Sequence, residues 1–373
     1  MNERLNNLTL HTLRQYRKLI ESSPNGIDLT VGEGHFHAPF NAKLGVYEAL
    51  LMNQTKYSTI SGEEDLRKKY VSKYYPQYSH DEVIITNGAT QGVFISLMSL
   101  INSNQDEVIV LAPYYPSYVQ IITLLGAKPI IIDTASDNFK ITVNKLKEHI
   151  TPNTVGLIIN EPCNPTGITY SLEEKSELLK LFKKKDLYII VDEVYRAYTN
   201  EDHVSFTELM DLDLKEKFIF INSLSKSHLM TGFRIGFVLS SKKIINNLHK
   251  LNCLMIASLS KLLQEGAKNA LDDDYYPNFV RKYYLNNTRY LQDELNELNI
   301  DYVKGNGGYY VFIRTDKLGL DDEGLAKILS EKYQIAVVPG RIFGEEYNHY
   351  IRVSCCRDIQ DIIRFIGVLR EIK

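Results

Sequence analysis

Seven short apolar runs, rich in β-branched residues, recur through the first two thirds of this 373-residue sequence. They are VIIT (83–86), VIVLA (108–112), PIIIDT (129–134), VGLIIN (155–160), LYIIVD (187–192), FIFIN (218–222) and IGFVLS (235–240). Each run is continuously apolar rather than alternating, which is typical of strands buried on both faces of a sheet. Helical patterns such as ATQGVFISLMSLI and SLEEKSELLKLFKKK lie between several of the runs. The sequence therefore predicts an α/β fold with a mostly parallel sheet and helices on both of its faces.

The pattern changes after residue 240. Two long helical segments (241–271 and roughly 275–298) lead into GGYYVFIR, a helix, QIAVVPG, YIRVS and a final helix, which indicates a smaller α+β domain. No linker rich in proline or serine separates the two parts. We expect an N-terminal segment (1–35) packed with the small domain, a large domain (36–245) and a small C-terminal domain (246–373).

Charge and cysteine usage narrow the class of protein. The formal net charge is −3, so no overall basic excess favours a nucleic-acid partner. The four cysteines show no paired metal-ligand spacing, so we expect neither a metal site nor a disulfide framework. The start, MNERLNNLTL, lacks a signal-peptide pattern, and no uncharged apolar run approaches the length of a membrane span. We therefore expect a cytoplasmic protein with no membrane partner.

Four polar stretches lie where strands of the expected large domain end. TNGATQG (86–92) opens a helix whose free N–H groups could bind an anion such as phosphate, although an ordinary capped turn would look the same. NEPCNPTG (160–167) places amide groups in a constrained turn, and VDEVY (191–195) ends a strand on an aspartate that requires a partner or is a helix cap. SLSKSHLMTGFRIGF (223–237) is a basic, hydroxyl-rich stretch that could equally be a solvated loop.

Taken in order, these stretches resemble the fold-type-I pyridoxal-phosphate enzymes, specifically the aminotransferase class I/II family. The matching motifs are NGAT, PYYPSY, NEPCNPTG, VDEVY, SLSKSHLMTGFRIGF and YIRVS, and they span about residues 27 to 354. The run from Lys226 to Gly236, with SK, five residues and then G-x-R-x-G, is the most specific of them. The resemblance implies a PLP-dependent transferase fold, a lysine-bound pyridoxal 5'-phosphate and amino acid chemistry.

The resemblance assigns four residues to the aldehyde, the ring nitrogen and the phenolate oxygen of the cofactor. Lys226 would bind the cofactor covalently and move a proton at the substrate Cα, which suits a lysine with a lowered pKa. Asp192 would pair with the pyridine nitrogen and keep it protonated. Tyr195 would donate its hydroxyl to the phenolate oxygen of the cofactor, and Asn164 would do so from the other side; a core tyrosine is the alternative for Tyr195.

The resemblance also implies a set of phosphate ligands. Backbone N–H groups at a helix start, serine hydroxyls and a bidentate guanidinium suit a dianion. A family tyrosine would reach the phosphate from the neighbouring subunit, so we expect a homodimer with shared active sites. These residues are Gly88, Ala89, Thr90, Ser223, Ser225 and Arg234, with Tyr57 as the residue from the second subunit; for Ser225, turn capping is an equal alternative.

Three further positions follow from the resemblance. Tyr115 of PYYPSY would stack on the pyridine ring, with Tyr114 as the competing assignment. Arg352 of YIRVS would bind the substrate α-carboxylate, with a surface ion pair as the alternative. Arg357 lies close to it in the sequence and is a competing assignment for this role. Gly32 would offer its backbone N–H to the same carboxylate, and Asn164 would also bind the substrate.

We expect transamination between an L-amino acid and a 2-oxo acid in two half-reactions with ping-pong kinetics. The alternative from the same fold is a β-C–S lyase or another eliminating enzyme, because cofactor motifs alone do not select the reaction. A cofactor-sensing regulator would need a DNA-binding domain, and the segment before residue 27 is too short for one. The lid stretch GEGHFH, with Gly34 where the family usually has proline, leaves the substrate preference open.

Overall fold

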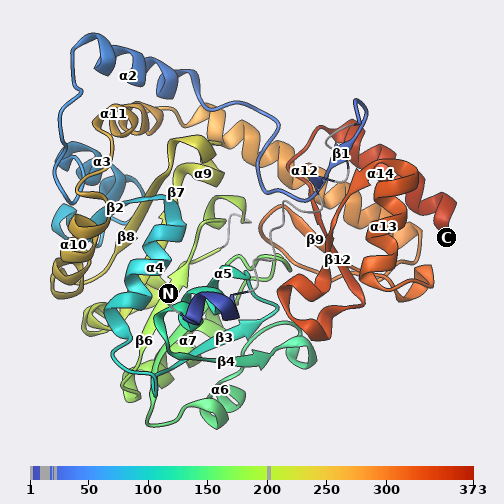
Figure 1. The fold of residues 1–373 in the computed structure, drawn as a ribbon, viewed down its shortest axis with the longest axis horizontal. Coiled ribbons are helices and arrows are strands. Elements are labelled where there is room, and N and C mark those ends of the chain that lie inside the picture. The colour runs from blue at the N-terminus through green and yellow to red at the C-terminus, as the bar shows by residue number, and fades with distance from the viewer. Residues whose placement is uncertain (1–2, 9–16, 19, 21–22, 200–202) are drawn as a thin grey trace.

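The computed structural model describes residues 3–8, 17–18, 20, 23–199 and 203–373. Figure 1 shows two parts, a large one built on a central sheet and a smaller one that contains the C-terminus. The central sheet has seven strands in the order β2-β8-β7-β6-β5-β3-β4. Their bounds are β2 (Val83–Asn87), β3 (Glu107–Ala112), β4 (Lys128–Asp133), β5 (Thr154–Asn160), β6 (Tyr188–Asp192), β7 (Phe218–Ser223) and β8 (Ile235–Leu239).

Each of the seven apolar runs forms one of these strands, and the predicted α/β fold is confirmed. Neighbours from β7 to β4 pair in parallel, whereas β8 pairs antiparallel with both β2 and β7. The sequence does not distinguish β8, because it is as apolar as the parallel strands. Burial on both faces fails for β4, the strand beside β3 at one side of the sheet, where Ile131 is 43% exposed.

Alternate residues of the six strands other than β4 enter two separate hydrophobic cores. Ile190 and the strand residues that face the same side of the sheet pack against α4 (Gly88–Leu100), α5 (Ser117–Leu125) and α10 (Lys242–Ile256). Ile189 and its equivalents face the other side of the sheet, in a core with α3 (Glu64–Tyr74), α6 (Val143–His149), α7 (Leu172–Lys184) and α11 (Lys261–Ala270). This two-sided burial explains why the runs are continuously apolar.

The smaller part has its own core and its own sheet. Strands β11 (Val338–Pro339), β12 (Tyr350–Ser354) and β9 (Tyr310–Arg314) form an antiparallel sheet in that order. Helices α12 (Tyr275–Glu297), α13 (Asp322–Tyr333) and α14 (Ile359–Ile372) contribute to the core beside it. The early strand β1 (Ile27–Asp28) pairs in parallel with β10 (Ile335–Ala336), so the chain enters the small part before it builds the large one.

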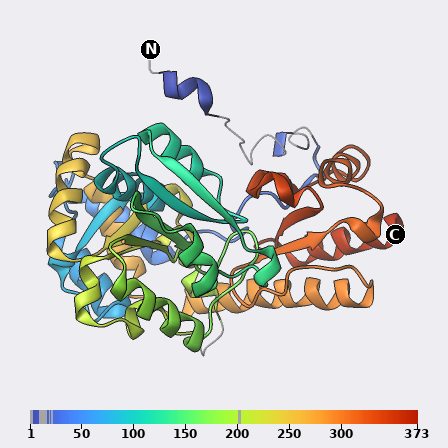
Figure 2. The same cartoon turned by 90° about the horizontal axis from the view of Figure 1, so that it is seen from below.

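The connection between the parts runs along α12, which both views show reaching from the large part into the small one (Figures 1 and 2). Beyond residue 245, α10 packs on α4, and α11 packs on α2 (Phe40–Leu51) and α3. The division of the chain into domains remains a proposal. This packing supports a boundary between α11 and α12 rather than at residue 245.

Chain direction brings the expected site residues to one edge of the central sheet, the edge formed by the carboxyl ends of the parallel strands. The parallel strands β3 to β7 all end at this edge, with Asn160 beside Asp192 in register. Because β8 runs the opposite way, it begins at this edge, directly after Arg234. The short helix α9 (Leu224–Ser227), which carries Lys226, connects the end of β7 to this region.

Candidate active site

A cavity of about 580 Å³ lies at this edge, between the central sheet and residues of the small part. Its lining comes from the N-terminal segment, α4, the strand ends, the α9 region, β9 and β12. It gathers all but two of the residues expected at the site: Gly32, Ala89, Thr90, Tyr115, Asn164, Asp192, Tyr195, Ser223, Ser225, Lys226, Arg234 and Arg352. The remaining two, Gly88 and Tyr57, are described below.

Lys226 is partly buried and lines this cavity. Its ammonium donates a hydrogen bond of 2.7 Å to the backbone oxygen of Gly32. Burial lowers the pKa of Lys226 to about 8, and the nearby positive charges of Arg352 and Arg234 act in the same direction. Roughly half of such amines are neutral at pH 8, compared with under 1% at the usual lysine pKa. Lys226 can therefore act as a nucleophile and as a base near neutral pH.

Asp192 forms the buried acidic group of the cavity. Its Oδ2 accepts a 2.6 Å hydrogen bond from the Tyr118 hydroxyl, and its Oδ1 accepts one of 3.2 Å from the Val194 N–H. Burial raises the pKa of Asp192 to about 6, and the hydrogen bonds from Tyr118 and Val194 limit this rise. The carboxylate is thus ionised above neutral pH and can pair with a cationic N–H group.

A second region of the cavity is built to bind an anion. The α4 N-terminus carries Gly88, whose φ of +73° lies in the left-handed region and whose N–H donates to the Arg234 backbone oxygen at 2.9 Å. A Cβ at Gly88 would lie 2.2 Å from Arg234 Nη2, so the guanidinium is packed directly over this turn. Ser223 Oγ donates to Ser225 Oγ at 2.8 Å or to the Ile235 backbone oxygen at 2.8 Å. The arrangement places helix N–H groups, hydroxyls and a cation together.

Arg352 lies at the side formed by the small part and is fully buried. Its Nη1 donates to Asn164 Oδ1 at 2.9 Å, and its Nη2 donates to the Thr30 backbone oxygen. Among the residues that the structure describes, its Nε has no hydrogen-bond partner. A fully buried cation with a donor left over is a strong candidate for binding a carboxylate.

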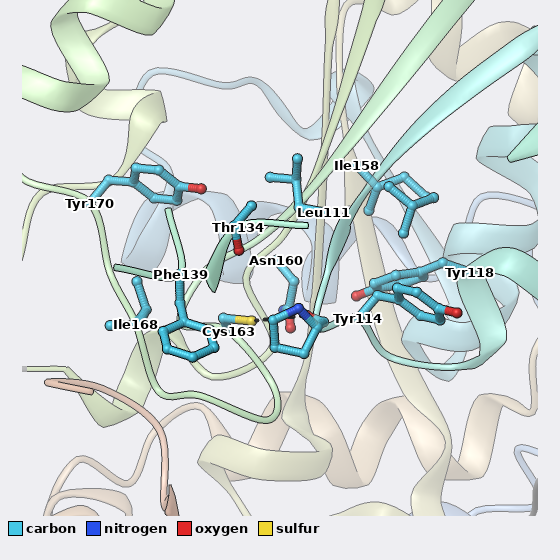
Figure 3. Close-up of a pocket in the computed structure, with 12 residues that line it drawn as sticks. Leu111, Tyr114, Tyr118, Thr134, Phe139, Ile158, Asn160, Cys163, Ile168 and Tyr170 are labelled. Atoms are coloured by element: carbon cyan, nitrogen blue, oxygen red, sulfur yellow. Dashed lines mark hydrogen bonds between the residues drawn. The ribbon is translucent and has the colours of Figure 1, made fainter. Parts of the chain in front are cut away.

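The structure distinguishes the two arginines that the sequence leaves as candidates for the carboxylate receptor. Arg352 lines the cavity, whereas Arg357 pairs with Asp28 at 3.0 Å and does not line it. The two tyrosines are separated as well. Tyr115 lines the main cavity, while Tyr114 lines a cavity of about 20 Å³ with Phe139 and Cys163 (Figure 3).

Tyr57 is the second expected residue that does not line the cavity. Its side chain is 90% exposed, and it is absent from the lining. The GEGHFH stretch (32–37) lines two neighbouring cavities. Glu33 lines the main cavity and accepts a 2.6 Å hydrogen bond from Thr231, whereas His35 and His37 line a neighbouring cavity of about 310 Å³.

Glycine at position 34 has a packing reason. A Cβ there would lie 2.5 Å from the Tyr284 hydroxyl and 2.6 Å from Leu229 Cδ2, so the lid passes too close to α12 for a larger residue.

Sequence reasoning missed two tyrosines that contact expected site residues. Tyr118 ends the PYYPSY motif without an expected role, yet it is the side-chain donor to Asp192. Tyr310 has no expected role either, yet its hydroxyl lies 3.1 Å from that of Tyr195 and its ring centroid lies 4.2 Å from the Arg352 guanidinium. The contacts cross 74 and 115 positions of the chain, and only the three-dimensional fold reveals them.

The chemistry of this donor set fits pyridoxal phosphate. The cofactor is an aldehyde with a basic ring nitrogen and a phosphate dianion, and the cavity offers a neutralisable amine, a buried carboxylate and an anion cradle for these groups. The cradle has room because both of its close approaches use glycine: a Cβ on Gly236 would lie 2.5 Å from the Gly88 carbonyl carbon. Buried Arg352, with its spare donor, would remain for a substrate carboxylate.

Comparison with known proteins leads to the same chemistry. The chain matches the family described as aminotransferase class I and II over residues 25–369. It is 32% identical over 361 residues to a probable N-acetyl-LL-diaminopimelate aminotransferase of Bacillus subtilis (strain 168), which covers 95% of this chain and 91% of that protein. It is 30% identical to an aspartate aminotransferase of Pyrococcus abyssi, covering 100% of this chain and 99% of that protein.

A solved structure of an aspartate aminotransferase from Thermus thermophilus, with maleate, superposes with a TM-score of 0.93 at 25% identity. The match covers 100% of this chain and 99% of that one. The family match extends over nearly the whole chain and includes every motif on which the resemblance rests. The chain therefore belongs to the aminotransferase class I and II family and is a pyridoxal-phosphate-dependent aminotransferase.

Proposed function

We propose that the chain transfers an amino group between an L-amino acid and a 2-oxo acid by a ping-pong mechanism in this cavity. The observation that carries the proposal is that Lys226, Asp192 and Arg352 line one cavity. These three side chains supply an amine, a ring-pairing carboxylate and a carboxylate receptor. When bound, pyridoxal phosphate supplies an aldehyde that bonds to amines and a ring that accepts electrons from a Cα bond.

Each residue of the chain has a separate task in this proposal. Lys226 holds the cofactor and moves the proton at the substrate Cα, because its lowered pKa allows both protonation states. Asp192 holds a proton on the ring nitrogen, and Arg352 with the Gly32 N–H orients the substrate through its α-carboxylate. The other residues bind the cofactor: Tyr195 and Asn164 at its phenolic oxygen, Tyr115 on its ring, and Ala89, Thr90, Ser223, Ser225 and Arg234 at its phosphate. Gly88, whose N–H donates to the Arg234 backbone oxygen, shapes the turn that presents these donors.

The reaction is tested by supplying the cofactor-loaded protein with single L-amino acids and with pyruvate or 2-oxoglutarate as acceptor. Mass spectrometry should detect a new amino acid and a new 2-oxo acid in equal amounts for at least one pair. Pyruvate and ammonia released from a cysteine conjugate without any acceptor would instead identify the protein as a β-C–S lyase. The screen also identifies the donor, because the relatives carry different substrate names.

Gly236 provides a test of the anion cradle that leaves every proposed ligand side chain in place. A Cβ at this position would lie 2.5 Å from the Gly88 carbonyl carbon and 2.7 Å from the Ala89 nitrogen, both of them backbone atoms. The turn must therefore move. We expect Gly236→Ala to weaken cofactor binding at least about ten-fold and to cost about 1–3 kcal/mol of folding stability.

Titration of the cofactor-free variant with pyridoxal phosphate, followed by absorbance, measures this effect. The control is Gly367→Ala, because a Cβ at Gly367 in α14 has no atom within 4 Å. Equal affinities of the two variants for the cofactor would contradict the assignment of the 88–90 turn as phosphate ligand.

We also propose that the protein is a homodimer in which Tyr57 completes the site of the partner subunit. The support is twofold: Tyr57 is 90% exposed and outside its own cavity, and apolar residues gather on the exposed side of nearby α2. Monomeric proteins rarely leave such large side chains clustered in water. These residues are Phe40, Tyr47, Leu50, Leu51 and Met52, which are between 53% and 71% exposed.

Mixing two defective variants tests the sharing of sites. Lys226→Ala and Tyr57→Leu, co-expressed with different tags, would form heterodimers in which one site carries both changes and the other carries neither. Random pairing makes half of the dimers mixed, so about a quarter of all sites should regain normal turnover. Activity no higher than that of the Tyr57→Leu parent, or a monomer by sedimentation, would contradict the shared site.

A reducing compartment fits the cysteines. Cys163, Cys253, Cys355 and Cys356 are all free thiols in the structure. Among the described residues, no helix has the length and apolar character needed to cross a bilayer. We propose a cytoplasmic location on these grounds.

A further inference from the structure

Tyr310 occupies a position that the assigned roles do not explain. It begins β9, is 4% exposed and lines the main cavity. Its hydroxyl lies 3.1 Å from the Tyr195 hydroxyl, and either oxygen can be the donor of that hydrogen bond. A Cβ on Gly32 would lie only 1.8 Å from the same hydroxyl, so Tyr310 reaches the segment proposed to bind the substrate carboxylate.

The ring of Tyr310 makes a second contact with the proposed carboxylate receptor. The Arg352 guanidinium lies 4.2 Å from the ring centroid, within the range of a cation–π interaction. Tyr310 is therefore in contact with Tyr195 through its hydroxyl and with Arg352 through its ring. One side chain joins the residue assigned to the cofactor oxygen to the residue assigned to the substrate.

We propose that Tyr310 is a positioning residue that donates its hydroxyl hydrogen to Tyr195, so that Tyr195 donates its own hydrogen more strongly to the phenolic oxygen of the cofactor. The inference rests on the proposed function, because it uses the roles given there to Tyr195 and Arg352. A hydroxyl that accepts one hydrogen bond becomes a better donor of another, and this cooperativity is greatest where water is excluded. No proton is transferred in this arrangement.

The surroundings of the Tyr310 hydroxyl favour this direction of donation. When Tyr195 donates to the cofactor, its oxygen keeps a free lone pair, and Tyr310 is the hydroxyl placed to fill it. Leaving that lone pair unfilled in a buried site would weaken the Tyr195 hydroxyl as a donor. The titratable or charged groups that contact Tyr310 or influence its pKa are Arg352, Tyr195, Tyr115, Tyr309 and Cys356.

The test is a pH titration of the visible absorbance of the cofactor bound to Lys226. A weaker hydrogen bond at the phenolic oxygen favours the protonated chromophore, so Tyr310→Phe should raise the pKa of the absorbance change by about 0.5–1 unit. Tyr309→Phe is the matched control: it removes an equally buried neighbouring hydroxyl, one that donates to the Gly32 backbone oxygen at 3.1 Å. A shift from Tyr310→Phe no larger than that from Tyr309→Phe would overturn the proposal.

A double-mutant cycle with Tyr195→Phe identifies the route of the effect. Tyr195→Phe alone should raise the pKa of the chromophore more than Tyr310→Phe does. Adding Tyr310→Phe to Tyr195→Phe should then produce no further shift, because the hydroxyl that received the hydrogen bond is gone. The same shift in both backgrounds would contradict the route through Tyr195.

The outcome also distinguishes failure of the inference from failure of the function. If Tyr195→Phe leaves the chromophore pKa unchanged while turnover stays intact, the role given to Tyr195 is wrong, and the inference is wrong with it. If Tyr195→Phe shifts the pKa and Tyr310→Phe does not, only the role of Tyr310 is wrong.

Steady-state kinetics separate the hydroxyl of Tyr310 from its ring. Tyr310→Phe keeps the ring beside Arg352, so the KM of the amino donor should change less than about three-fold while kcat falls. Tyr310→Leu removes the ring and should raise that KM about five-fold or more. Equal KM values for the two variants would contradict the contact between the ring and the carboxylate receptor.

Discussion

Lys226→Ala is expected to lower turnover by at least about 10⁴-fold, the upper end of what a positioned proton-transfer group contributes. The same change should remove the visible absorbance of the covalently held cofactor. Burial already lowers the pKa of this amine to about 8, so the cavity disfavours its charge. Removing it should therefore not destabilise the cofactor-free protein, and its melting temperature should stay the same or rise.

A second variant distinguishes covalent chemistry from simple charge. Lys226→Arg keeps a cation in the cavity, but a guanidinium does not deprotonate near neutral pH. It should be as inactive as the alanine variant and should lack the same absorbance. Recovery of turnover in Lys226→Arg beyond about 1% of the wild-type rate would contradict the role assigned to Lys226.

Asp192→Asn is expected to have the second largest effect, a loss of about 10²- to 10⁴-fold in kcat with the cofactor still bound. The carboxylate is buried, and with a pKa of about 6 it remains ionised above neutral pH. An ionised carboxylate can hold a proton on the ring nitrogen, whereas a neutral amide stabilises that charge far less. The geometry can survive the change, since the amide oxygen can accept from the Val194 N–H while the amide NH2 donates to the Tyr118 hydroxyl oxygen.

Rates measured in parallel with the bound cofactor absorbance test this prediction. The control is Asp186→Asn, an exposed aspartate two residues before β6, which carries Asp192 at its other end. Near-normal turnover in Asp192→Asn would contradict the ring-pairing role. Loss of the cofactor absorbance together with turnover would show that Asp192 holds the cofactor rather than tunes it.

The fold could be predicted from the sequence wherever burial leaves a pattern. Two-sided burial makes a run continuously apolar, and six of the seven runs form central strands that are buried on both sides. The seventh run forms β4, where Ile131 is exposed. Strand direction leaves no such pattern. The antiparallel pairing of β8 follows from the short return through α9 and Arg234, which is too short for the crossover that parallel strands need.

The site residues also fall into two groups, those that the sequence predicts and those that it does not. Motifs at strand ends could be read because a parallel sheet brings those ends to one edge, and Asp192 and Lys226 do line one cavity there. Contacts between residues of the large part and residues of the small part could not be predicted from the sequence. Tyr310 reaches Tyr195 because β9 of the small part lines the same cavity as the segment after β6, and its sequence, GGYYVFIR, looks like an ordinary buried strand.

The central claim is that one molecule of this protein accepts an amino group and then passes it on. Mixing the cofactor-loaded protein with an equal amount of a donor identified by the screen, with no acceptor present, should convert its visible absorbance to that of the aminated cofactor. One equivalent of 2-oxo acid should form. Adding a 2-oxo acid acceptor should restore the original spectrum and yield one equivalent of the new amino acid. A spectrum that never converts with any L-amino acid, or that converts and cannot be reversed by any 2-oxo acid, would contradict the claim.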